Sequence, residues 1–401
     1  MKIDFNCTIN IDILSPKLKD ISTGFSQIMQ QLLQQLFQQI VTSFAEHYIA
    51  THGEAISCDR CRGRDIIWKT HRGKQTSILT IFGIVQLYQM QIQCNSCKHK
   101  MYITRRLLGI EARKKIPLET IKRLGLLGAL TTYRVARKIV GMFGIELNAM
   151  VVWRSVQRLS KEIALGIDPA EEGKGEADGT GIPIQGIKKR GKELKIFVQL
   201  KKSGGVRVAG LSIGDYDSNW DKLFKPLLAA LKKFKNFLLV TDGDTSILKG
   251  LGKEVKVLYQ RCLWHIPHQF KWYLWKDKVK KGSAEWIKAL SVLLEITNTK
   301  NIQHDKECVE KIVELKNARL TELISKCEEN GWRHSATYLR NAQPDMFTSL
   351  RNRLSGKTTS RVERVMKTVN MRINVGKWSQ SGALNVNKIR LAHYYNGYNV
   401  E

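Results

Sequence analysis

The chain has 401 residues, which suggests roughly two to four domains, and 43% of them are hydrophobic, as is ordinary for a protein with packed cores. Its 66 Lys and Arg outnumber its 36 Asp and Glu, giving a net charge of +30. That charge indicates a polyanionic partner, with nucleic acid as the leading candidate. No apolar run reaches the ~18 residues of a membrane span, so we expect no membrane partner.

The N-terminus lacks the apolar core of a signal peptide. Eight Cys in such a chain are expected to be reduced thiols or metal ligands rather than a disulfide framework. Residues 1–57 form an N-terminal helical segment, because apolar side chains recur at three- and four-residue steps over residues 18–50. This helix either packs on its own domain or mediates dimerisation. The lack of a sustained heptad with charged flanking positions favours the first.

Two Cys-x-x-Cys pairs mark residues 58–105. They are Cys58 with Cys61 and Cys94 with Cys97. The interval between the pairs is rich in β-branched and apolar residues and predicts a β-hairpin, which would bring the four thiolates together. Four Cys at this spacing predict a zinc ribbon whose Zn²⁺ is structural, because no coordination position is left open for chemistry.

Residues 106–168 predict a helix-turn-helix module. One helix covers 133–142, a turn follows, and Asn148 is a suitable N-cap for a second helix that reaches Ile163. One face of the second helix is apolar, and the other carries the expected DNA contacts Arg154, Arg158 and Lys161. A plain helical hairpin is the alternative.

From residue 172 the pattern becomes α/β. Strands are expected at 177–185, 194–200 and 206–213, then a helix at 220–234, a strand at 237–241, a helix at 246–253 and a strand at 255–259. This is the element order of an RNase H-like mixed sheet. We assign residues 172–275 with 352–401 to that catalytic domain and residues 276–351 to a helical insertion. Aromatic and basic residues interleave over 270–281, either as a DNA-binding surface or as a core-facing stripe.

Three carboxylates stand out in this basic chain. Asp178 lies on the first strand, and Asp242 ends the fourth. The first and fourth strands are neighbours in an RNase H-like sheet, so these acids should face each other. Glu363 is the only acid between Met346 and Val400 and is expected to complete the set. A divalent cation would relieve the repulsion between them, and hard oxygen ligands suit Mg²⁺ or Mn²⁺.

Each acid also has a structural explanation. Glu176 shares a strand face with Asp178, and Asp244 shares one with Asp242, so either could be the functional acid or a turn residue. Glu363 completes a Ser-x-x-Glu spacing that is typical of a capping box, and could simply cap its helix.

Four short motifs together resemble the DDE transposases of the mutator-like superfamily, which bacterial and archaeal insertion sequences encode. They are Asp178-Gly179-Thr180, Thr241-Asp242-Gly243, Cys262-Leu263-Trp264-His265 and Glu363. The resemblance covers roughly residues 170–401. It implies a metal-dependent enzyme that cleaves the ends of a DNA element and transfers them into a target. Cys262 and His265 match a Cys/Asp-x-x-His motif of that group, and we expect them to support the site or contact DNA.

The predicted function is therefore a DNA transposase with Asp178, Asp242 and Glu363 as catalytic Mg²⁺ ligands. Double-stranded DNA, comprising terminal inverted repeats and target, is the expected partner, bound by a homo-oligomer in the cytoplasm at the nucleoid. Further DNA contacts are expected from Arg361, Arg364 and Lys367. The alternatives are a non-catalytic DNA-binding regulator derived from a transposase, or a structure-selective nuclease of RNase H-like fold.

Overall fold

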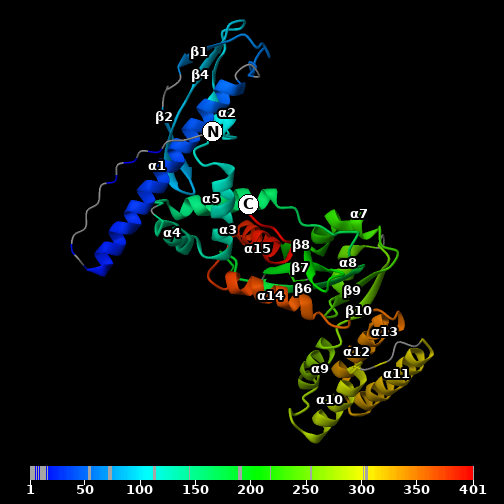
Figure 1. Cartoon of the computed structure of the whole chain (residues 1–401). Helices are drawn as coiled ribbons and strands as arrows, with labels where there is room; N and C mark the ends of the chain where they lie inside the picture. The colour runs from blue at the N-terminus through cyan, green and yellow to red at the C-terminus, as the bar shows by residue number, and fades with distance from the viewer. Residues whose placement is uncertain are drawn as a thin grey trace. The chain divides into compact units, whose positions relative to one another are not determined.

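The computed structural model describes the chain except for residues 1–4, 6, 8, 10–14, 16, 53–55, 71–74, 112–113, 144, 188–191, 217, 253–254, 301, 303–305 and 401. The protein is a mixed α/β structure of two compact units (Figure 1). The first unit is Met1–Glu162 with Asn399–Glu401, and the second is Ile163–Tyr398. Within the described residues, no helix combines the length and apolar character needed to cross a membrane.

The first unit contains a long helix, two small sheets and a group of short helices. In chain order these are α1 (Leu18–His52), β1 (Ile66–Thr70), β2 (Gln75–Thr80), β3 (Gly83–Tyr88), β4 (Gln91–Cys94), β5 (Lys100–Tyr102), α2 (Ile103–Leu107), α3 (Leu118–Leu130), α4 (Tyr133–Gly141) and α5 (Ala149–Glu162). The strands pair antiparallel, β1-β4-β5 in one sheet and β2-β3 in the other. The interval between the two Cys pairs, expected to form one β-hairpin, thus contains the four strands β1 to β4, divided between two sheets.

Helix α1 uses only part of its apolar surface within its own unit. Phe37 and Val41 pack against the β2–β3 cluster, and Ala45 is fully buried beside the Cys-rich sheet. Phe25 and Phe44 on the same helix are 61% and 47% exposed. The expected packing of this helix on its own domain is therefore present over its C-terminal half, and a large apolar face is left in contact with solvent.

Helices α3 and α5 pack closely because small residues line their contact. A Cβ atom added to Gly128 of α3 would lie 2.6 Å from Val152 Cγ1 of α5. Val152 and Val156 are fully buried, as their apolar face predicts. The Asn148 side chain accepts a hydrogen bond from the Met150 N–H at 3.0 Å, which confirms the expected N-cap. Gly144, in the expected turn before it, lies outside the described residues.

A five-stranded mixed sheet forms the centre of the second unit. Its strands are β6 (Lys174–Ile182), β7 (Lys192–Leu200), β8 (Val206–Gly214), β9 (Phe237–Thr241) and β10 (Val257–Arg261), in the order β10-β9-β6-β7-β8. Strands β6, β7 and β8 are antiparallel, whereas β9 runs parallel to both β6 and β10. The first and fourth strands are neighbours, as expected from the sequence.

Two elements of this unit differ from the sequence prediction because of proline. Strand β6 begins at Lys174 and ends at Ile182, before Pro183, which has no N–H to donate to a neighbouring strand. The helix expected over 220–234 is interrupted at Pro226, giving α6 (Trp220–Phe224), a 3₁₀ turn η2 (Lys225–Leu227) and α7 (Leu228–Leu231).

Helices cover both faces of the sheet. Ala177 of β6 belongs to a core cluster with Trp220 and Phe224 of α6, on the face also covered by α8 (Thr245–Leu251). Side chains alternate along a strand, so Glu176 points to the opposite face, where α14 (Ser360–Ile373) lies against β6. Helix α15 (Gln380–Tyr395) packs beside β8.

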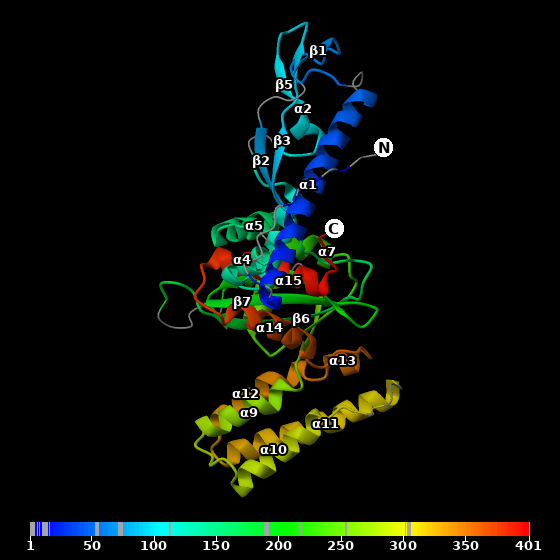
Figure 2. The same ribbon diagram turned by 60° about the vertical axis from the view of Figure 1, so that its left-hand side comes forward.

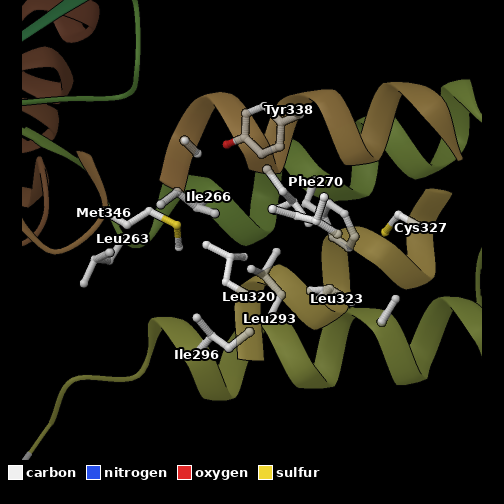
Figure 3. Close-up of a cluster of buried hydrophobic side chains, with 14 of the residues drawn as sticks. Leu263, Ile266, Phe270, Leu293, Ile296, Leu320, Leu323, Cys327, Tyr338 and Met346 are labelled. Carbon is white, nitrogen blue, oxygen red and sulfur yellow. The ribbon is translucent and has the colours of Figure 1, made fainter. Parts of the chain in front are cut away.

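The remaining helices of the second unit form a helical body with its own apolar core (Figures 1 and 2). They are α9 (His265–Lys276), α10 (Ala284–Thr297), α11 (Lys306–Glu329), α12 (Arg333–Ala342), a 3₁₀ turn η3 (Gln343–Asp345) and α13 (Thr348–Arg351). Ile266 and Phe270 of α9 point into this core together with Leu320 (Figure 3). The core therefore begins at Leu263, before the expected start of the insertion at residue 276.

Two leucines of α11 test this core. Leu320 is fully buried and Leu315 is 66% exposed. Leu320→Ala is expected to lower the free energy of unfolding by about 2–5 kcal/mol, because it leaves a cavity among packed helices. Leu315→Ala is expected to change it by less than about 0.5 kcal/mol. Urea denaturation followed by circular dichroism measures both, and equal effects would contradict the described core.

Candidate functional site

The four paired cysteines lie at one end of the β1-β4-β5 sheet. Cys58 and Cys61 occupy the turn before β1, Cys94 ends β4, and Cys97 lies in the turn before β5. Their four sulfur atoms all lie within 4.8 Å of one another. The Sγ atoms of Cys58 and Cys97 are 3.5 Å apart, as are those of Cys61 and Cys94. This arrangement can hold one zinc ion.

The two Cys-x-x-Cys turns share a backbone geometry. Arg62 and Lys98, each directly after the second Cys of its pair, have φ angles of 58° and 56°. Non-glycine residues seldom adopt this left-handed conformation, so the turns hold it against a local energy cost.

Backbone N–H groups in both turns point at sulfur. The N–H of Cys97 lowers the pKa of Cys94 to about 6, and the N–H of Cys61 lowers the pKa of Cys58. The first Cys of each turn therefore favours the thiolate form, which is the metal-binding form, whereas hydrogen bonds with the neighbouring thiols raise the pKa of Cys61 to about 12.

Asp178 and Asp242 lie at matching levels of neighbouring strands. In the parallel pairing of β6 with β9, Glu176 is opposite Val240, and each aspartate comes two residues later. Burial and, to a smaller extent, the negative charge of Asp242 together raise the pKa of Asp178 to about 7. The Asp242 carboxylate accepts one hydrogen bond, from the Asp244 N–H at 3.1 Å. The structure thus brings these two acids together as predicted.

The two competing acids are engaged in capping helices. Glu176 is buried, and its carboxylate accepts hydrogen bonds from the N–H groups of Arg361 and Val362, at 3.0 and 2.8 Å, in the first turn of α14. Asp244 is the N-cap of α8 and accepts from the Ser246 N–H at 2.8 Å. Neither Asp178 nor Asp242 caps a helix in this way: Asp178 accepts from the adjacent Gly179 N–H at 2.8 Å, and Asp242 from the Asp244 N–H.

Glu363 lies in the first turn of α14. Its Oε1 accepts a hydrogen bond from the Thr359 hydroxyl at 3.1 Å and lies 3.7 Å from His265 Nε2. The N-cap is Thr359 rather than Ser360, and the Thr359 side chain accepts no capping hydrogen bond from its own helix. The Ser-x-x-Glu spacing therefore does not form a capping box here.

Cys262 and His265 connect to Glu363 through Thr359, whose side chain is fully buried. Cys262 Sγ accepts from the Thr359 N–H at 3.3 Å and lies 3.4 Å from its hydroxyl, which is also 3.3 Å from His265 Nδ1. Burial opposes ionisation of both residues. Their mutual hydrogen bond nevertheless lowers the pKa of Cys262 and raises that of His265, and the charges of Asp242 and Glu363 raise the His265 pKa further.

His265 also influences Asp178, whose pKa its positive charge lowers. All three predicted acids therefore lie within electrostatic reach of this histidine. Their oxygen atoms are less tightly gathered than the four sulfurs. Among the described residues, the Cys group is the only set of three or more such ligands within 4.8 Å.

Two further charged residues of β7 adjoin the site and were missed by the sequence analysis. Burial raises the pKa of Glu193, and Asp244 and Asp242 add to the rise. Its carboxylate would be 2.2 Å from a Cβ atom on Gly179, the residue after Asp178. Lys195 is fully buried and donates to Glu193 at 2.9 Å and to the Tyr216 carbonyl at 2.7 Å. The sequence signal that could have identified these two residues is a Glu-x-Lys pair within an otherwise apolar strand.

A cavity of about 780 Å³ opens beside Asp242. Its lining includes Tyr216, Asp242, Arg261, His268, Trp272 and Tyr338. Oxygen ligands, cations and aromatic rings thus face one space that is large enough for part of a substrate.

The predicted DNA contacts are mostly accessible. Arg154 and Lys161 of α5 are exposed, whereas Arg158 forms an ion pair with Glu111. On α14, Arg364 and Lys367 are exposed, and Arg361 is half-buried with a hydrogen bond to the Gly205 carbonyl at 3.4 Å.

No protein-family model matches the chain, and no curated protein matches it. Among solved structures, a chain of the Drosophila P element transposase strand transfer complex is similar at a TM-score of 0.39 and 12% sequence identity, over 72% of this chain and 95% of that one. At this TM-score the two chains are not shown to share a fold.

The Cys site makes a direct prediction about metal content. Purified protein is expected to retain about one zinc per chain, and Cys94→Ser is expected to lose it, because three thiolates no longer close the tetrahedron. Cys308→Ser, at a half-buried position outside the cluster, is the matched control. Elemental analysis measures the ratio, and a folded, zinc-free wild type would contradict the prediction.

Proposed function

We propose that the protein is a DNA transposase with an RNase H-like catalytic domain, which cleaves the ends of a DNA element and transfers them into target DNA. The observation that carries the proposal is that Asp178 and Asp242 each lie two residues beyond the last paired residues of the adjacent parallel strands β6 and β9. Glu363 joins them from α14 through the Thr359–His265 contacts. The net charge of +30 supports a nucleic-acid substrate.

The acids fit a divalent cation on electrostatic grounds. Burial and, to a smaller extent, the neighbouring Asp242 charge raise the pKa of Asp178 to about 7, so a nearby positive charge would favour its ionised form. Asp178, Asp242 and Glu363 offer only oxygen atoms, the ligands that Mg²⁺ and Mn²⁺ prefer. Such an ion, when bound, supplies Lewis-acid stabilisation of a phosphoryl group undergoing in-line displacement.

The chain's own residues position this chemistry. Glu176 fixes the first turn of α14 against β6, and the Thr359 hydroxyl orients the Glu363 carboxylate. His265 lies beside Glu363 and adds positive charge among the acids when protonated. Arg364 and Lys367, exposed on the same helix as Glu363, would bind the phosphates of double-stranded DNA.

The first unit would supply recognition of the element ends. We assign the four Cys to a structural zinc ribbon and α4–α5 to a helix-turn-helix, with Arg154, Arg158 and Lys161 contacting DNA. A homo-oligomer on paired inverted repeats fits this role. Binding by these cations would weaken steeply as salt rises, because phosphate contacts release counterions.

The central test uses a DNA duplex that carries the inverted repeats flanking the gene. With Mg²⁺, the wild type is expected to yield cleaved or strand-transferred product. Asp242→Asn is expected to lower product more than about a hundredfold while DNA binding persists, because a metal ligand is lost. Asp215→Asn is the control, since Asp215 is exposed and pairs with Lys192. Undiminished product from Asp242→Asn would refute the assignment. Cleavage without strand transfer would favour the nuclease alternative, and binding without product the regulator.

A second test addresses Thr359. Thr359→Val keeps the side-chain shape but removes the hydroxyl, and is expected to lower cleavage about 10–100-fold with a higher Mg²⁺ requirement, because Glu363 loses its orienting donor. Thr359→Ser keeps the hydroxyl and is expected to retain activity. Titrating Mg²⁺ against initial rate separates the two variants, and an unchanged Mg²⁺ requirement in Thr359→Val would count against the role.

A further inference from the structure

A second large hollow, of about 930 Å³, adjoins the candidate catalytic residues within the second unit. Its lining includes Trp264, His268, Lys271, Lys300, Lys357 and Thr358. Trp264 directly precedes His265, and Thr358 directly precedes Thr359, so the hollow lies next to the Thr359–His265–Glu363 contacts. The proposed catalytic function assigns no role to this hollow.

An exposed aromatic ring forms part of its wall. Trp264 is 51% exposed, whereas Ile266 and Phe270 of α9 point into the helical core (Figure 3). The Trp264 ring lies against the His268 ring, with centroids 4.0 Å apart and planes tilted by 37°. His268 therefore packs against part of the Trp264 ring. The exposed part of that ring is available to stack on a planar ligand.

The charged side chains that line the hollow are basic. Lys271, Lys300 and Lys357 line it, and no Asp or Glu is among the described lining residues. The Lys357 ammonium donates to the Thr299 carbonyl at 3.2 Å, and burial lowers its pKa. A partly buried ammonium group without a carboxylate is stabilised by an anion from outside the chain.

We propose that this hollow binds one nucleotide of an unpaired DNA strand, with its base on Trp264 and its phosphate at Lys357 and Lys271. An aromatic ring combined with cations matches base stacking and phosphate binding. In a duplex both faces of a base are covered by its neighbours, so only an unpaired or extruded base offers a free face to a tryptophan.

The inference rests on the proposed function and adds a substrate requirement to it. The hollow and the acids adjoin the same residues, so the bound nucleotide would lie close to the phosphate that reacts. The DNA would therefore be locally unpaired beside the cleavage position, and substrates that are already frayed there would bind more tightly than fully paired ones.

The test measures binding of a fluorescent ten-nucleotide thymidine strand and of a matched duplex at fixed salt by anisotropy, with the full chain. Trp264→Ala is expected to weaken binding of the single strand about tenfold, the typical loss of one stacked base. Trp264→Phe keeps an aromatic face and is expected to bind like the wild type. Lys357→Ala is expected to weaken the same binding.

The matched control is Trp275→Ala, because Trp275 lies on the same helix, is 68% exposed and lies outside the hollow. It is expected to leave affinity unchanged. If it weakened binding as much as Trp264→Ala, the exposed helix face rather than the hollow would be the binding surface, and the proposal would be wrong. Wild-type affinity in Trp264→Ala, with its fold verified by circular dichroism, would also overturn it.

Two further measurements distinguish a free nucleotide from DNA as the ligand, and distinguish failure of the nucleotide site from failure of the proposed function. Trp264-dependent binding of free deoxyadenosine monophosphate without binding of the strand would overturn the assignment to DNA. A wild type that binds duplex but not single strand would remove the nucleotide site and leave the proposed function standing. A wild type that binds neither DNA would refute the proposed function itself, and the nucleotide site with it.

Discussion

The candidate site depends on one buried contact between Glu176 and the start of α14. The first N–H groups of a helix have no acceptor within the helix and carry partial positive charge. A buried carboxylate is costly unless it is hydrogen-bonded. Glu176 accepts from the Arg361 and Val362 N–H groups, which offsets part of the cost of its burial, although burial still raises the pKa of Glu176 to about 7. This contact joins positions 185 residues apart and fixes Glu363 relative to the strand that carries Asp178.

A second set of contacts orients side chains once that helix is in place. Thr359 is fully buried and brings together a thiol, an imidazole and a carboxylate from Cys262, His265 and Glu363. The acids, in turn, raise the pKa of the histidine. Parallel pairing of β6 with β9 independently sets Asp178 beside Asp242. The backbone pairing of β6 with β9 thus positions the two aspartates, whereas side-chain contacts with Thr359 orient Glu363. Loss of the first would disturb Asp178 and Asp242, and loss of the second would disturb Glu363.

Local patterns in the sequence predicted much of this structure. The pair spacing of the four Cys predicted their cluster, the apolar face of α5 predicted its buried side, and β9 has the expected bounds. Proline explains two of the differences, because Pro183 and Pro226 lack the N–H that would continue β6 and the helix expected over 220–234. The buried pair Glu193 and Lys195 was missed because charged residues in a strand normally indicate solvent, and only the surrounding fold makes them mutual partners.

The sequence by itself determined which residues carry charge, thiols and helix or strand periodicity, since these depend on side-chain chemistry and neighbours along the chain. It favoured Asp178 with Glu176 as a competitor on the same strand face, and left Glu363 as either a cap or a site residue. Only the tertiary structure shows which hydrogen-bond donors reach each carboxylate. Glu176 meets the amides of α14, whereas Glu363 meets the Thr359 hydroxyl and His265. Those partners come from segments far apart in the chain, which no local pattern encodes.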